Sequence, residues 1–137
     1  MAGTRTLSLA ESGAVALAEA ASALDTAENT EAFLHALANN RNVWNTLRDI
    51  AHNENWTVPD QRETAFALDT SAKRGVNDDD IHALVEINRR VSRALAGGDV
   101  EELREQAYYI WDDRGRPHGQ ALDHWLLAEM KLRGQHQ

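Results

Sequence analysis

Histidine and acidic side chains are the first candidates for chemistry, because together they can bind metals and transfer protons. The chain has six His, none of them in a pair with the i, i+4 spacing of a helical metal site. His118 and His124 lie six residues apart, with Asp112, Asp113 and Asp123 nearby. This spacing favours solvated or helix-capping roles, so we predict no metal site.

The acidic run Asp78-Asp79-Asp80 is a second candidate, in this case for a cation site. A calcium loop needs ligands at alternating positions, a glycine and a distal glutamate. Here the run leads directly into an apolar helical pattern, where carboxylates at the first turn stabilise the helix. We therefore predict a helix cap.

No combination of residues indicates catalysis. The sequence has no GxSxG motif, no glycine-rich phosphate loop and no carboxylate pair in an apolar setting. Because it has no Cys, thiolate nucleophiles, thiolate metal sites and disulfides are excluded. We expect a protein that is not an enzyme and that needs no cofactor.

Two Asn-Arg pairs interrupt apolar helical stripes: Asn40-Arg41, with Trp44 on the same stripe, and Asn88-Arg89. A buried Asn must find hydrogen-bond partners or it costs free energy. The favoured interpretation is that the two Asn bond to each other or to backbone across a helix interface and fix its register. In the alternative, the pairs border a groove for a partner helix, and the partner-binding residues are Asn40, Arg41, Trp44, Asn88 and Arg89.

Composition limits the possible classes of protein. With 137 residues, 42% hydrophobic and 26% charged, the chain is one globular domain or one domain with a small appendage. Its net charge of -8 and the lack of a basic segment argue against direct nucleic-acid binding. Glu11 and Glu19 interrupt the apolar N-terminal region, which favours an amphipathic helix over a signal peptide. We expect a cytoplasmic protein that does not enter a membrane.

Hydrophobic periodicity predicts an all-α fold without a strand. We expect a small bundle of about four helices over residues 1–96 and an αα-hairpin over residues 97–137, separated at Gly97-Gly98. The expected helices are about 7–24, 30–51, 60–74, 78–96, 100–113 and 119–133.

The expected hairpin carries two Trp fourteen residues apart, which favour a hairpin core over a ligand platform. Its polar turn contains Gly and Pro. We predict structural roles in the core and turn for Trp111, Gly115, Arg116, Pro117, Gly119, His124 and Trp125.

Both Asn-Arg stretches also carry a family resemblance. The segments NNRNVW, VPDQR and IHALVEINRRVSRAL, in this order, resemble the FlaF family of flagellar biosynthesis regulators over about residues 30–96. The resemblance implies a small cytoplasmic helical protein that promotes flagellin synthesis or secretion. Its implied partners are flagellin and an FlbT-like translational regulator.

The C-terminal segment REQAYYIWDDRGRPHGQALDHWLLAE is similar to a short bacterial domain of unknown function. The shared pattern is A-Y-x-x-W-x-x-x-G-R-P-x-G-x-x-x-x-H-W-x-x-A-E. This second resemblance implies a fold but no function.

Together these features predict a non-enzymatic protein that holds an amphipathic helix of flagellin in a groove between bundle helices. One alternative is a regulator that acts on flagellin mRNA through a partner. Another is a general or stress-related scaffold that acts through the C-terminal hairpin. An enzyme ranks last.

Overall fold

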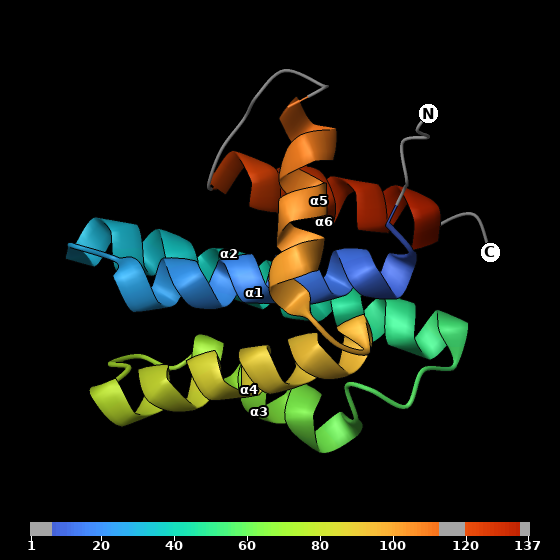
Figure 1. Cartoon of the computed structure of the whole chain (residues 1–137). Coiled ribbons are helices and arrows are strands. Elements are labelled where there is room, and N and C mark those ends of the chain that lie inside the picture. Colours follow the sequence, from blue (N-terminus) through green and yellow to red (C-terminus); the bar gives the residue numbers. More distant parts are fainter. Residues whose placement is uncertain (1–6, 113–119, 135–137) are drawn as a thin grey trace.

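The computed structural model describes residues 7–112 and 120–134, which form six α-helices and no strand. The predicted all-helical class is therefore confirmed. No helix in this part of the chain is long and apolar enough to cross a bilayer. The helices are α1 (Leu9–Thr26), α2 (Thr30–Glu54), α3 (Gln61–Ser71), α4 (Asp78–Ala96), α5 (Val100–Asp112) and α6 (Gln120–Gly134) (Figure 1).

The first four helices begin at side-chain caps that the local sequence supplies. At α4, the Asn77 side chain accepts a hydrogen bond from the Asp80 N–H (2.8 Å), and the Asp80 carboxylate accepts one from the Asn77 N–H (3.2 Å). The Asn77 N–H, together with Lys73, lowers the pKa of Asp80. The predicted capping role of the acidic run is confirmed. The described residues contain no group of three or more His, Asp or Glu that could hold a metal.

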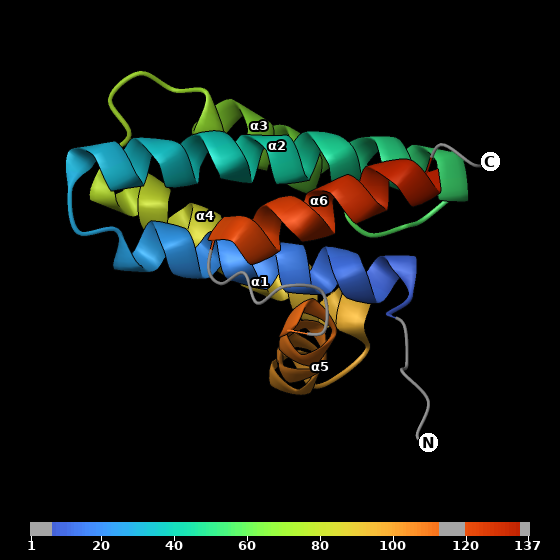
Figure 2. The same cartoon turned by 90° about the horizontal axis from the view of Figure 1, so that it is seen from above.

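The Ala-rich α1 is the centre of the fold, with α2, α4, α5 and α6 packed around it. Its side chains at Ala14, Ala16, Leu17 and Ala20 are fully buried. Small side chains let neighbouring helices approach closely, so a helix with little apolar bulk still makes extensive contacts. Figures 1 and 2 show α2 and α4 running along α1, whereas α5 runs across it.

The last two helices both pack on the bundle, and the turn of the predicted αα-hairpin, residues 113–119, lies outside the described part of the chain. In the part of the chain that the structure describes, α5 packs on α1 and α4, whereas α6 packs on α1 and α2 (Figure 2). Leu103 and Ala107 of α5 and Leu126 and Met130 of α6 belong to the same hydrophobic cluster as the α1 side chains. The reason is physical: two short helices offer each other little apolar area, and α1 offers each of them a larger apolar surface.

The residues predicted for the hairpin core and turn are only partly described. The backbone of Trp111 lies in α5, and the backbones of His124 and Trp125 lie in α6. Their side chains lie outside the described part of the chain, as do Gly115, Arg116, Pro117 and Gly119 entirely. Their structural roles stay predictions.

Candidate partner-binding site

Asn88 is the centre of a buried hydrogen-bond network that joins α1, α2 and α4. Its Nδ2 donates to Asn40 Oδ1 (2.6 Å) and to the Leu17 carbonyl (3.3 Å). Its Oδ1 accepts from Trp44 Nε1 (2.8 Å). Asn40 Nδ2 donates to Ser71 Oγ (3.1 Å), which adds the last residue of α3 to the network.

This network confirms the interpretation that Asn40 and Asn88 bond to each other across a helix interface. A sliding of α4 along α2 would separate the two amides. Each buried polar group left without a partner costs about 1–3 kcal/mol. The network therefore favours one register of α2 against α4 over neighbouring ones.

The same geometry corrects part of the partner-binding prediction. Asn40, Trp44 and Asn88 have no exposed surface at all. A partner on the surface cannot contact them while the bundle keeps this packing. These three residues belong to the core.

Arg41 and Arg89 are both exposed, but on different helices. Arg89 Nη2 lies 3.6 Å from Asp25 Oδ2 in a solvent-exposed ion pair, which contributes little to stability. Arg89 also lines a surface hollow between α1, α4 and the start of α5, and Arg41 is not among the residues that line it. The two Asn-Arg pairs therefore do not border this hollow together.

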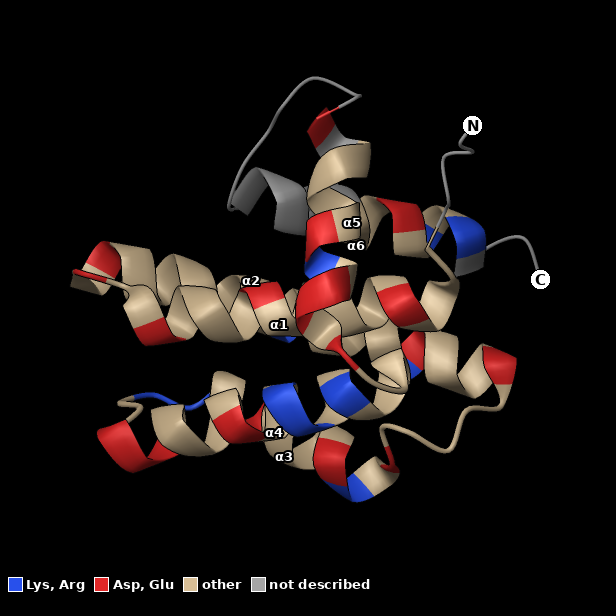
Figure 3. Cartoon of the chain, viewed as in Figure 1, with Lys and Arg blue, Asp and Glu red and all other residues tan. Residues whose placement is uncertain are grey.

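This α1–α4–α5 hollow has a volume of about 450 Å³. Ala18 and Ser22 of α1 and Ser92 of α4 give it small side chains, so a partner backbone can approach closely. Arg89 and Arg93 come from successive turns of α4, and the basic segments of α4 lie below α5 in the view of Figure 3. The remaining lining residues are Gly98 and Asp99 of the α4–α5 connection and Val100, Glu101 and Arg104 of α5.

A cluster of buried polar groups holds α5 beside this hollow. Glu19 of α1 is 6% exposed and accepts hydrogen bonds from Arg104 Nε (2.7 Å) and from the Tyr108 hydroxyl (3.0 Å). Burial opposes the charge of Arg104, but the carboxylates of Glu19 and Glu101 outweigh it, so the pKa of Arg104 lies above its ordinary value. Burial, together with the Glu19 carboxylate, raises the pKa of Tyr108. The cluster fixes the position of α5 across α1.

The residues that complete this site, Arg93 and the polar cluster around Glu19, were not predicted from the sequence. Arg93 follows Arg89 by four residues, and this spacing on a helix is a sufficient basis for placing both on one face. The partners of Glu19 are 85 and 89 residues away in the chain. No local pattern connects them.

A comparison with protein-family models matches residues 100–133, less than half of the chain, to a protein family of unknown function (DUF2934). This match confirms that the C-terminal segment is similar to a domain of unknown function. No curated protein and no solved structure matches the chain. None of these comparisons supports the FlaF resemblance of residues 30–96, which stays a prediction.

Proposed function

We propose that the protein is a non-enzymatic adaptor that binds an amphipathic helix of a partner protein in the α1–α4–α5 hollow. The observation that carries this proposal is the combination of small side chains in the hollow with two arginines from successive turns of α4. Small side chains admit a helix backbone, and arginines bind carboxylates through paired hydrogen bonds.

Arg93 is the main candidate for partner contact. It is exposed, and within the described residues its side chain forms no ion pair. Among the described residues, Arg89 has the long contact with Asp25, which a better-placed carboxylate of the partner can replace. Arginine is a frequent source of binding energy at the centre of protein interfaces.

The proposed partner is flagellin, and this identity rests on the resemblance of residues 30–96 to the FlaF family. Flagellin ends are amphipathic helices, and a hollow between bundle helices is a common way to hold such a segment. In this proposal the protein acts in the cytoplasm and covers the aggregation-prone ends before export. It thereby promotes flagellin synthesis or secretion, together with an FlbT-like regulator.

Binding of purified monomeric flagellin tests the hollow with two matched variants. Arg89→Glu/Arg93→Glu reverses both arginines of the hollow. Arg41→Glu/Arg48→Glu reverses two exposed arginines of α2 that do not line it, with the same change in net charge. We expect the first variant to weaken binding about tenfold or more and the second to change it little.

The outcomes separate the two parts of the proposal. If wild-type protein does not bind flagellin, the partner assignment is wrong. If wild type binds and the Arg89→Glu/Arg93→Glu variant binds equally well, the assignment to this hollow is wrong. Circular dichroism of both variants checks that they keep the helical content of the wild type.

A further inference from the structure

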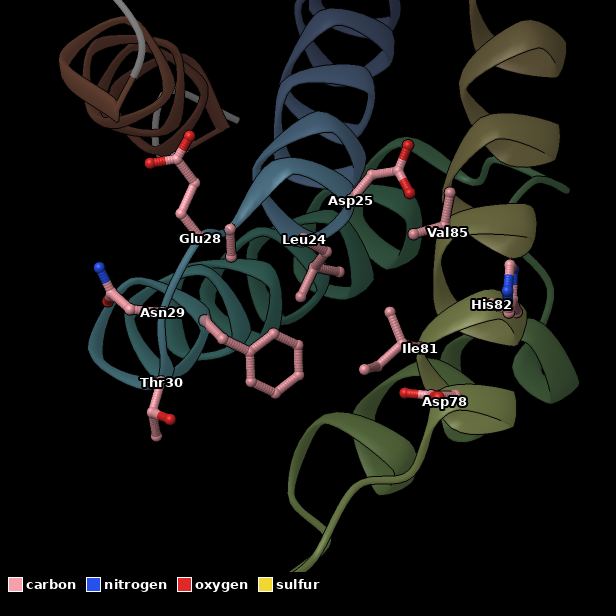
Figure 4. A pocket seen from close by; sticks show the side chains of 11 residues that line it. Leu24, Asp25, Glu28, Asn29, Thr30, Asp78, Ile81, His82 and Val85 are labelled. Carbon is pink, nitrogen blue, oxygen red and sulfur yellow. The ribbon is translucent and has the colours of Figure 1, made fainter.

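A second hollow lies further along the α1–α4 interface, between the C-terminal end of α1 and the N-terminal ends of α2 and α4. Its volume is about 450 Å³. Leu24, Ile81 and Val85 point into it (Figure 4), and Phe33 of α2 also lines it. Leu24 and Val85 are buried, whereas Phe33 and Ile81 are half-buried. The α1–α2–α4 hollow therefore has an apolar interior that remains partly open to solvent.

Three carboxylates lie around this apolar interior. Asp25, Glu28 and Asp78 line the hollow together with the imidazole of His82, and the described residues contribute no Lys or Arg to its lining. Figure 4 shows the Asp78 carboxylate turned toward the space and the Glu28 carboxylate turned outward. In the part of the chain that the structure describes, Glu28 and Asp78 form no ion pair, and Asp25 has only the 3.6 Å contact with Arg89.

The helix ends offset only part of this negative charge. The N-terminal ends of α2 and α4 both border the hollow, at Thr30 and Asp78. Each helix N-terminus is equivalent to roughly half a positive charge. Against three carboxylates this leaves a clear negative excess beside apolar side chains, in a size range typical of binding sites.

We infer that the α1–α2–α4 hollow binds a protein segment that presents a lysine or arginine beside a large apolar side chain. The apolar side chain fills the space between Leu24, Phe33 and Ile81. The cationic group lies at the rim, within reach of Asp25 and Asp78. A cationic amphipathic helix meets both requirements, because its positions i and i+3 or i+4 share one face.

This inference does not depend on the proposed function. The α1–α4–α5 hollow presents arginines and selects carboxylates, whereas the α1–α2–α4 hollow presents carboxylates and selects cations. Because Arg89 of the first hollow pairs with Asp25 of the second, the single reversal Arg93→Glu, which leaves this pair in place, is the variant that tests the first hollow alone. Failure of one proposal is therefore distinguishable from failure of the other.

The test uses the full chain and two labelled helical peptides of equal length, measured by fluorescence anisotropy. One peptide carries leucine and lysine on an amphipathic pattern, and the other has glutamate at each lysine position. The test variant is Asp25→Asn/Asp78→Asn, and its matched control is Asp49→Asn/Asp69→Asn, which removes two exposed carboxylates elsewhere. Ile81→Ala tests the apolar part of the hollow.

We expect the lysine peptide to bind, the glutamate peptide not to bind, and high salt to weaken binding. The Asp25→Asn/Asp78→Asn variant is expected to bind about three- to tenfold more weakly than its matched control, and Ile81→Ala to bind more weakly than wild type. Equal weakening in both double variants would mean that the lysine peptide responds only to overall acidity, and it would overturn the inference. No binding of the lysine peptide, or no effect of Ile81→Ala, would also overturn it.

Discussion

Replacement of Asn88 by alanine is the most informative perturbation of the fold, because one side chain makes three of the buried hydrogen bonds. Asn88→Ala leaves two side-chain groups without a partner in the core. These are the Nε1–H of Trp44 and the Oδ1 of Asn40. The Leu17 carbonyl lies within α1 and keeps its place in the helix ladder.

The magnitude follows from these two orphaned groups. Each buried donor or acceptor left unpaired costs about 1–3 kcal/mol, so we expect Asn88→Ala to lower the free energy of unfolding by about 2–6 kcal/mol. A domain of this size is stable by only about 5–15 kcal/mol. The variant is therefore expected to lose a large fraction of its stability.

Urea unfolding followed by far-UV circular dichroism measures this loss. A double-mutant cycle with Trp44→Phe isolates the hydrogen bond between Trp44 and Asn88, because phenylalanine has no N–H to leave unpaired. We expect the two losses to be non-additive, with a coupling of about 1–3 kcal/mol. Arg41→Ala is the control: it lies beside Asn40 but is exposed, and it should change stability by less than about 0.5 kcal/mol.

Two results would refute this reasoning. One is a loss for Asn88→Ala no larger than that of Arg41→Ala. The other is a strictly additive cycle, which would mean that the Trp44–Asn88 contact contributes nothing and that only lost packing matters.

Two further predictions concern a helix end and the α5 contact. Gly97 is the C-cap of α4 with φ 69°, where a side chain is strained, whereas Gly98 has no positive φ and has open space where a Cβ would lie. Gly97→Ala should therefore cost about 1 kcal/mol in urea unfolding and Gly98→Ala almost nothing; equal costs would contradict the role of the left-handed cap. The pKa of Tyr108 is higher in the folded state than its unfolded value of about 10. The hydrogen bond of the neutral hydroxyl to Glu19 therefore stabilises the fold fully below about pH 10, and this stabilisation is lost as pH rises through the folded pKa. Tyr108→Phe should have a lower free energy of unfolding than wild type at neutral pH, and this difference should shrink above about pH 10. A difference that stays constant with pH would show that ionisation of the Tyr108 hydroxyl does not affect stability.

The sequence alone was sufficient for the features that depend on near neighbours in the chain. Caps such as Asn77 with Asp80 act over three residues, and apolar periodicity marks each helix within a few turns. The Asn40–Asn88 bond is a long-range contact that was still predictable. Each Asn interrupts an apolar stripe, and two buried amides satisfy each other at little cost.

The tertiary structure decided which surfaces meet. The sequence predicted an amphipathic helix in the N-terminal region and a hairpin over residues 97–137, because neighbouring helices joined by a short turn usually pack together. In the described part of the chain, α5 packs on α1 and α4, and α6 packs on α1 and α2. The contact of Glu19 with Arg104 and the two hollows along the α1–α4 interface follow from that arrangement. They depend on the apolar area that all the helices bury together, a quantity that no single segment of the sequence contains.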